Sequence, residues 1–297
     1  MTTLFTEIDE RHGGQHGRTA VVQYLRSDVA DLCRASFAAQ DTRDDALSTA
    51  ACVAYLCGWK AYDAKEHGLA QRYYLQALAL TREAGDDLHG AWTLRILAHN
   101  GMDVRQPRHT LALADAALTR VHGRVSPVTE ALFVVTRARA LAVAGRAKEA
   151  VAQIRSAHEL ALRDEPDDLP FWARLWGSPH ATVASHTAKT FRALGDHANA
   201  EKHYAASART RGGMPHQQRI TALTLAAQGR AQAAQGHLEE ACTTWHRSLD
   251  LCGDVRSARV TDEVRAIRSR LTTFRSRGVR AAEHLDERAR AWQKARR

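Results

Sequence analysis

The chain has 297 residues, of which 44% are apolar, 6% aromatic and 25% charged, and its formal net charge is +9. This composition is typical of a soluble globular or repeat protein, and no window approaches about eighteen consecutive apolar residues, which excludes a membrane-spanning helix. The first residues, MTTLFTEIDERHGG, carry acids instead of a basic start and an apolar run, so they predict no secretion signal and we expect a cytoplasmic protein.

A small residue recurs every forty to fifty positions along the chain, which indicates a repeated structural unit. The repeated positions are Ala70, Thr110, Ala150, Ala200 and Ala241. A second small residue stands twelve positions before each of them and a third stands seven positions after, so two helices can cross closely in every unit. We therefore expect each unit to be a pair of helices.

Glycines and prolines stand where these helices should end and begin, and no segment has the pattern of a β-strand. The glycines at expected ends are Gly85, Gly123, Gly145, Gly195 and Gly236, and the prolines at expected starts are Pro107, Pro127, Pro179 and Pro215. The sequence predicts an all-α fold: an α-solenoid of about five helix pairs over residues 44–255, with flanking helices in residues 1–43 and 256–297.

Residues 58–78, GWKAYDAKEHGLAQRYYLQAL, and 229–249, GRAQAAQGHLEEACTTWHRSL, resemble the tetratricopeptide repeat (TPR) in their small and aromatic positions. The resemblance implies a concave groove lined by the first helix of each pair. The matching positions are Tyr55, Trp59, Tyr62 and Asp63 in the first unit, Trp92, Arg95, His99 and Asp103 in the second, and Arg139, Lys189, Arg192 and Arg230 in later units.

One end of this expected groove is aromatic and the other is basic. Arginine offers a planar donor fork for carboxylate or phosphate, and Trp and Tyr offer rigid apolar area. Such a groove suits an extended peptide with an acidic group or C-terminal carboxylate, a partner protein, or a small apolar ligand that carries an anion. The alternative is that several of these side chains pack between helices or lie in solvent.

Residues 164–179, DEPDDLPFWARLWGSP, lengthen one interval of the repeat. Insertions in repeat proteins usually fall on one face, where function often resides. Phe171, Trp172 and Trp176 could form a lid or a docking site for a partner, or could fill a gap between successive pairs. Both interpretations remain open at the level of sequence.

Residues 6–29, 58–86 and 257–271 look like the region after the DNA-binding domain in actinobacterial transcriptional regulators of the xenobiotic-response-element type. That resemblance implies a TPR sensor region with a role in transcriptional or developmental regulation. Members of the group carry an amino-terminal helix-turn-helix domain, and this sequence contains no candidate for one. We therefore do not expect sequence-specific DNA binding from such a domain.

Residues 255–297 hold 13 Lys and Arg against 5 Asp and Glu, so most of the net charge lies there. A basic cluster can bind nucleic acid. The same segment also has the apolar periodicity of two amphipathic helices, which favours a helical cap with an arginine-rich outer face. The second interpretation is a direct DNA-binding transcriptional regulator, either a fragment of a longer chain or one that uses these basic helices, and a homodimer through the stripe that ends at Trp292 is a further possibility.

The histidines and cysteines do not form a catalytic or metal-binding motif. His12 and His16 could supply two metal nitrogens, but no third ligand is evident. The cysteines, five in number, lack metal-type spacing and are expected to be reduced and mostly buried. A Cys/His pair formed in space is left open, but we expect a non-enzymatic protein without cofactor or bound metal.

Overall fold

The computed structural model describes residues 1–104, 106–163, 169–213, 217–276 and 278–296. Within these residues the chain is helical and contains no strand, which confirms the predicted all-α solenoid. Pro215, one of the expected helix starts, and part of the insertion, residues 164–168, lie outside the described residues.

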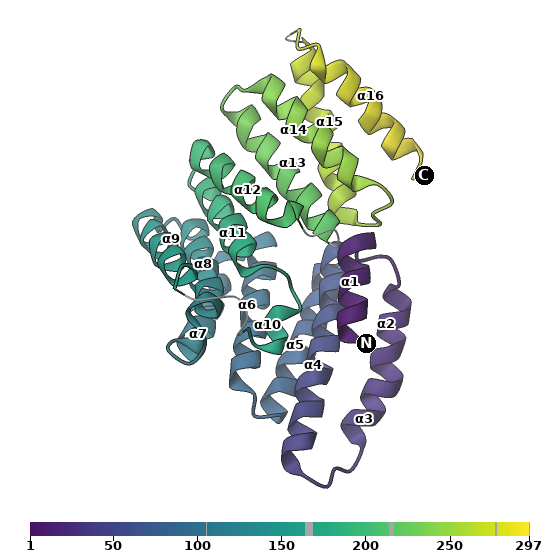
Figure 1. The fold of residues 1–297 in the computed structure, drawn as a ribbon, viewed down its shortest axis with the longest axis vertical. Coiled ribbons are helices and arrows are strands. Elements are labelled where there is room, and N and C mark those ends of the chain that lie inside the picture. The colour runs from purple at the N-terminus through teal and green to yellow at the C-terminus, as the bar shows by residue number, and fades with distance from the viewer. Residues whose placement is uncertain (105, 164–168, 214–216, 277, 297) are drawn as a thin grey trace.

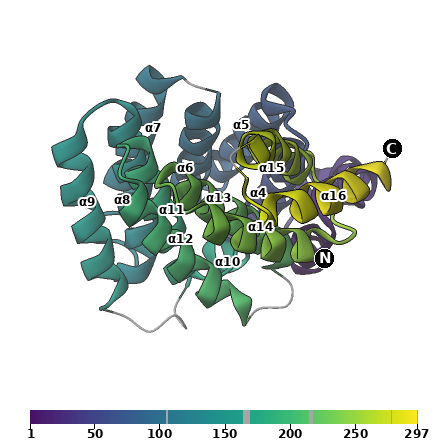
Figure 2. The ribbon, with the colours of Figure 1, turned by 90° about the horizontal axis from the view of Figure 1, so that it is seen from above.

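Five helix pairs follow one another along the described chain and form a curved row (Figures 1 and 2). The pairs are α4 (Gln40–Asp63) with α5 (His67–Glu83), α6 (Asp87–Asp103) with α7 (Pro107–Val121), α8 (Pro127–Val143) with α9 (Ala147–Ala161), α11 (Pro179–Ala193) with α12 (His197–Gly212), and α13 (Gln218–Ala234) with α14 (Leu238–Cys252). The short helix α10 (Phe171–Arg174) lies between the third and fourth pairs in the sequence.

The small residues of the repeat explain the close crossing of the helices. A Cβ atom at Gly58 would come within 2.5 Å of the Tyr74 ring, and one at Gly229 would come within 2.4 Å of the Trp245 ring. Tyr74 and Trp245 therefore pack directly on the backbone of the partner helix, and any larger residue at Gly58 or Gly229 would push the two helices apart.

Helix ends follow the chemistry expected from the sequence. Gly145 and Gly195 adopt φ values of 79° and 80°, which glycine accepts without strain. At the starts of α6 and α12, the carboxylates of Asp86 and Asp196 accept hydrogen bonds from backbone N–H groups three residues later, at 2.9 and 3.0 Å. Short connections join the two helices of a pair and most successive pairs, whereas the insertion separates α9 from α11.

Helices flank the array at both ends. At the amino-terminal end are α1 (Thr2–His12), α2 (Arg18–Tyr24), the π-helix η1 (Leu25–Val29) and α3 (Ala30–Arg34). The first repeat helix, α4, begins at Gln40, four residues before the expected start of the array. The longest of these flanking helices, α1, lies beside both α4 and α13, so it bridges the first and fifth pairs (Figure 1).

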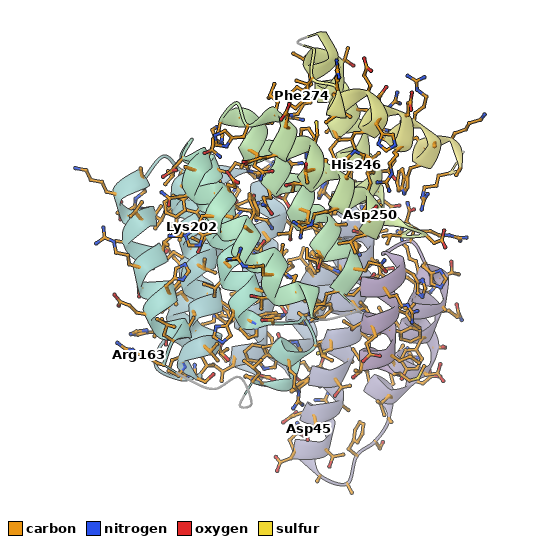
Figure 3. The ribbon with its side chains drawn as sticks, turned by 45° about the horizontal axis from the view of Figure 1, so that its top comes forward. Asp45, Arg163, Lys202, His246, Asp250 and Phe274 are labelled. Carbon is orange, nitrogen blue, oxygen red and sulfur yellow. The ribbon has the colours of Figure 1, made fainter. Side chains whose placement is uncertain are left out.

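At the carboxyl-terminal end, α15 (Ala258–Ser276) and α16 (Ala281–Lys294) pack on α14. The Phe274 ring stacks on Trp245 with centroids 5.8 Å apart. His246 and Asp250 of α14, labelled in Figure 3, lie 3.0 and 2.7 Å from guanidinium nitrogens of Arg288 on α16. Apolar and charged contacts therefore join α15 and α16 to the last pair. No described helix is both long and apolar enough to cross a bilayer.

A buried ion-pair network, formed by Asp9, Glu10, Lys60, Asp63 and Arg219, attaches α1 to the array. The Lys60 ammonium donates to Asp9 Oδ1 at 3.1 Å, and Arg219 Nη2 donates to Asp9 Oδ2 and to Glu10 Oε1, both at 2.6 Å. Arg219 Nη1 lies 3.2 Å from Asp63 Oδ1. Burial by itself would lower the pKa of Arg219, but Asp63, Asp9 and Glu10 hold that pKa well above its ordinary value.

Candidate functional site

A cavity of about 520 Å³, here called the main cavity, opens on the concave side of the array. Its walls come from α4, α6, α8, α11 and α13, the first helices of the five pairs, together with α1, α10, α12 and α15. A side cavity of about 280 Å³ shares Tyr62, Arg139, Lys189 and Arg259 with it. The main cavity has the size of a typical small-molecule site.

The structure brings together nearly all the predicted groove residues. The main cavity is lined by Tyr55, Trp59, Tyr62, Trp92, Arg95, His99, Arg139 and Lys189, and the side cavity by Tyr62, Asp103, Arg139, Lys189, Arg192 and Arg230. Asp63 lines neither cavity. It is fully buried in the ion-pair network, where its carboxylate also accepts from Gly14 N and Ser257 Oγ, both at 2.9 Å.

Aromatic side chains form one wall of the main cavity. The Trp176 ring lies 4.4 Å from the Tyr55 ring and 6.3 Å from the Trp59 ring, centroid to centroid. Trp59 also stacks on Tyr62 at 5.3 Å. These rings give the cavity a rigid apolar surface at a low cost in side-chain entropy.

The insertion contributes to the cavity in two different ways. Phe171 and Trp176 line the main cavity, and Phe171 remains 40% exposed. Trp172 is buried instead, stacked parallel to His89 at 6.1 Å and 5.5 Å from Trp92. Trp172 therefore anchors α10 on α6, which holds the other two rings at the cavity wall. A lid function for these residues remains a prediction.

Cations form the other wall, and they differ in their partners. Arg139 Nη2 donates to Asp103 Oδ1 at 2.8 Å. Arg95 donates through Nε to the Leu132 carbonyl oxygen at 3.0 Å and lies 4.5 Å over the Trp92 ring, with no carboxylate partner among the described residues. Burial lowers the pKa of Arg95 to about 10. The cavity therefore holds at least one buried cation without a counter-charge.

Lys189 is the second cation of the main cavity without a carboxylate partner. Its ammonium group has no hydrogen-bond or ion-pair partner in the part of the chain that the structure describes, and it lines both cavities. Burial, followed by the nearby Arg139, lowers the pKa of Lys189 well below its ordinary value. An anion placed beside this amine would stabilise the charged form, which the free protein disfavours.

A histidine pair lies beside these cations. The rings of His99 and His186 meet edge to face at 4.4 Å. The Thr136 hydroxyl donates to the Leu132 carbonyl oxygen, so His99 Nε2 must donate to Thr136, and His99 Nδ1 accepts from Arg139. Burial, above all, lowers the pKa of both histidines well below the ordinary value, so both are neutral at pH 7.

Sequence analysis missed several residues that line the main cavity. Arg259 comes from α15 and Thr6 from α1, and neither helix belongs to a repeat, so repeat spacing could not identify them. Arg211 is at the end of α12, the second helix of its pair. His186 could have been found, since it stands three residues before Lys189 and so on the same face of α11.

A Cys/His contact does occur, but not in a reactive form. Cys52 Sγ lies 3.7 Å from His89 Nε2. Burial raises the pKa of the thiol to about 12 and lowers the pKa of His89 to about 4. Both groups are therefore neutral at pH 7, whereas a nucleophilic cysteine requires the thiolate. Among the described residues, no group of three or more His, Cys, Asp or Glu side chains could hold a metal ion.

Arginines of α15 and α16 pair with acids of the same cap. Arg268 Nε donates to Asp286 Oδ1 at 2.8 Å, and Arg265 Nη1 donates to Asp262 Oδ1 at 3.2 Å. Such pairing reduces the positive potential that a nucleic-acid backbone would meet. Part of the positive charge of the tail is thus paired within the protein, although residues 255–297 still hold 13 Lys and Arg against 5 Asp and Glu.

Comparisons with solved structures find the same fold at low sequence identity. A Rap protein, solved in complex with competence and sporulation factor, matches with TM-score 0.56 at 16% identity over 85% of this chain and 70% of that one. BtubC from P. vanneervenii matches with TM-score 0.52 at 12% identity over 80% of this chain and 90% of that one. The described fold is thus a TPR-like solenoid.

A weaker likeness, with TM-score 0.44 at 13% identity over 73% of this chain and 97% of that one, is to a Podospora anserina kinesin light chain with TPR-like repeats. No family model matches the chain. No curated protein matches it either.

Proposed function

We propose that the chain is a non-enzymatic, ligand-responsive regulatory protein that binds an anionic, partly aromatic ligand in the main cavity. The ligand class comprises a short peptide with an acidic group or a free C-terminal carboxylate, and a small aromatic molecule that carries an anion. The observation that carries the proposal is that an aromatic wall and two cations without carboxylate partners, Arg95 and Lys189, line one cavity of about 520 Å³.

The chemistry of the cavity supports this ligand class. Arg95 is buried and Lys189 is half-buried, and neither has a carboxylate partner among the described residues, so a ligand anion would offset the cost of removing these charges from water. Trp59 Nε1 and His186 Nδ1 are buried atoms without hydrogen-bond partners in the described chain. Orphaned polar atoms in a cavity wall are commonly satisfied by water or by a ligand.

The placement of the cavity supports a regulatory role. Its walls belong to all five helix pairs and to the flanking helices α1 and α15, so a ligand contacts elements distant in the sequence. Ligand binding would favour the solenoid curvature in which these walls fit it, and the outer surface would change accordingly. The likeness to Rap supports a peptide or protein factor as the ligand by analogy of fold alone. The resemblance to actinobacterial regulators supports a role in transcriptional or developmental control.

Native mass spectrometry of the protein purified from its own host tests the proposal. We expect a retained small mass that is lost on denaturation, and the same measurement reports a bound protein partner or a homodimer. Trp59→Ala should weaken retention at least about tenfold, because a large aromatic contact is removed from the wall. Lys189→Met should do the same by removing the unpartnered amine.

A matched control is Lys202→Met on α12, whose side chain is exposed and lies outside both cavities (labelled in Figure 3). This variant also removes one lysine charge but should retain the ligand fully. Equal retention by the Trp59 and Lys189 variants and the wild type would show that the main cavity is not the ligand site.

A further inference from the structure

A third cavity, separate from the main cavity, gathers three arginines from three helices. This arginine pocket, of about 490 Å³, is lined by Arg192 of α11, Arg230 of α13 and Arg270 of α15, with His197, Leu238 and Phe274 among its other residues. It borders the side cavity through Arg192 and Arg230 and shares no lining residue with the main cavity. Phe274, one of its lining residues, is labelled in Figure 3.

The positive charge of the arginine pocket is largely unmatched. Arg230 pairs with Glu263. Arg192 has no hydrogen-bond or ion-pair partner among the described residues, and Arg270 donates to the backbone oxygen of Ala266 at 3.2 Å. Three guanidinium groups and one carboxylate leave a net charge of +2.

Some exposed arginines of this protein are paired, whereas others, such as Arg72, Arg155 and Arg209, have no ion-pair partner among the described residues. Arg124 Nη1 donates to Asp87 at 2.9 Å, and Arg146 donates twice to Glu149 at 2.6 Å. Charge pairing is thus available on this surface and is absent at Arg192 and Arg270. Burial, followed by the nearby positive charge of Arg192, lowers the pKa of Arg230 to about 10, and Arg270 contributes in the same direction. All three arginines line the same pocket, so one anion bound there can face each of them.

The remainder of the pocket is apolar. Ala231, Ala234, Leu238 and Phe274 form its apolar surface. His197 Nδ1, at the start of α12, is buried and has no hydrogen-bond partner in the described chain. An ion alone would leave this apolar surface uncovered, so the occupant should carry an apolar or aromatic group beside its anion.

We propose that the arginine pocket binds a small phosphate monoester, with the phosphoryl group between Arg192, Arg230 and Arg270 and its apolar or aromatic substituent on Leu238 and Phe274. A phosphate monoester carries about −1.5 to −2 charges at pH 7, which matches the net charge of the pocket. The planar guanidinium fork fits phosphate oxygens in pairs. This site is independent of the ligand proposed for the main cavity.

Isothermal titration calorimetry at constant ionic strength tests this inference with two probes that share a ring. Phenyl phosphate should bind at least about tenfold more tightly than phenylsulfonate, because the former is a dianion at pH 7.5. Lowering the pH to about 5.5 should weaken the binding of phenyl phosphate, since its second pKa is near 6. Arg192→Gln and Arg270→Gln should each weaken the affinity for phenyl phosphate at least about fivefold, because each removes one charge-assisted pair of hydrogen bonds. Both arginines are exposed, so the variants should fold normally.

Two variants act as controls. Arg124→Gln removes one surface charge from a paired arginine, and Trp59→Ala alters the main cavity; both should bind phenyl phosphate like the wild type. Equal affinity for the two probes would overturn the inference. Loss of binding in Trp59→Ala, with none in Arg192→Gln and Arg270→Gln, would place the anion in the main cavity and overturn it as well.

Discussion

The ion-pair network contains the buried Lys60 and the main cavity the half-buried Lys189, and the two lysines differ in their surroundings. Lys60 is 1% exposed, donates to Asp9 at 3.1 Å and to the His16 carbonyl oxygen at 3.0 Å, and lies in a cluster where acids and cations alternate. Lys189 lines an open space with cations nearby and has no partner among the described residues. The paired charge of Lys60 holds helices together, whereas the unpaired charge of Lys189 is free to bind a ligand anion.

This difference separates structural from functional charge in one protein. A buried ion pair is destabilising to break, because the remaining partner keeps its burial cost. A buried cation without a partner lowers stability from the start, and its retention is explained by a ligand that supplies the missing anion. The following expected outcomes test this distinction, from the largest effect to the smallest.

Lys60→Met should lower the free energy of unfolding by about 3–5 kcal/mol, because it leaves Asp9 Oδ1 and the His16 carbonyl without their donor. Denaturant unfolding followed by circular dichroism measures this. The control is Lys65→Met, whose exposed ion pair with Asp262 should contribute about 0–1 kcal/mol. Similar losses in the two variants would mean that the network does not stabilise the fold as proposed.

The histidine pair of the main cavity should make the protein sensitive to mild acid. Because the folded-state pKa values of His99 and His186 lie below the unfolded value, the unfolded chain binds more protons as the pH falls through about 6.5. Unfolding free energy should fall between pH 7.5 and 5.5 by about 1 kcal/mol for each histidine. His186→Phe should remove about half of this part of the pH dependence; an unchanged slope would show that His186 binds the same number of protons in the folded and unfolded states.

Lys189→Met should raise the free energy of unfolding by about 1 kcal/mol, since it replaces a cation that has no partner with an apolar side chain of similar length. The same variant should lose ligand, so stability and binding should change in opposite directions. Thermal unfolding in the absence of ligand measures the gain. A loss of stability as large as that of Lys60→Met would contradict the distinction between the two lysines.

Binding of an anion in the main cavity should take up a fraction of one proton. The pKa of Lys189 is depressed in the free protein, and an adjacent anion would raise it. Calorimetry in two buffers with different ionisation enthalpies measures the uptake, and affinity should weaken as the pH rises through the pKa of the bound state. Lys189→Met should abolish that buffer dependence, and a buffer dependence that survives in this variant would assign the proton to another group.

The fold could be predicted because its determinants are local and recur. Gly58 with Tyr74, and Gly229 with Trp245, lie within one helix pair, so spacing along the sequence identifies both members of each contact. Most groove residues were predicted for the same reason, since they occupy equivalent positions of successive first helices.

Residues whose partners are distant in the sequence could not be predicted in this way. Asp63 has the spacing of a groove residue, but its carboxylate meets Arg219 and Ser257, far along the chain. Arg259 reaches the main cavity from α15, where no repeat position exists for comparison. Spacing identifies the face of a helix, while the identity of the helix opposite depends on how the whole array curves.

The bridge made by α1 has a consequence for how this protein folds. In a simple solenoid each repeat contacts only its neighbours, so stability is a sum of local terms and the ends can unfold alone. Here a hydrogen bond joins Arg219 to Asp9 across 210 residues. Helix α1 must therefore wait for α13 before it can dock, and formation of this contact is a late, non-local step. Once it has formed, the first and fifth pairs should unfold together as one cooperative unit.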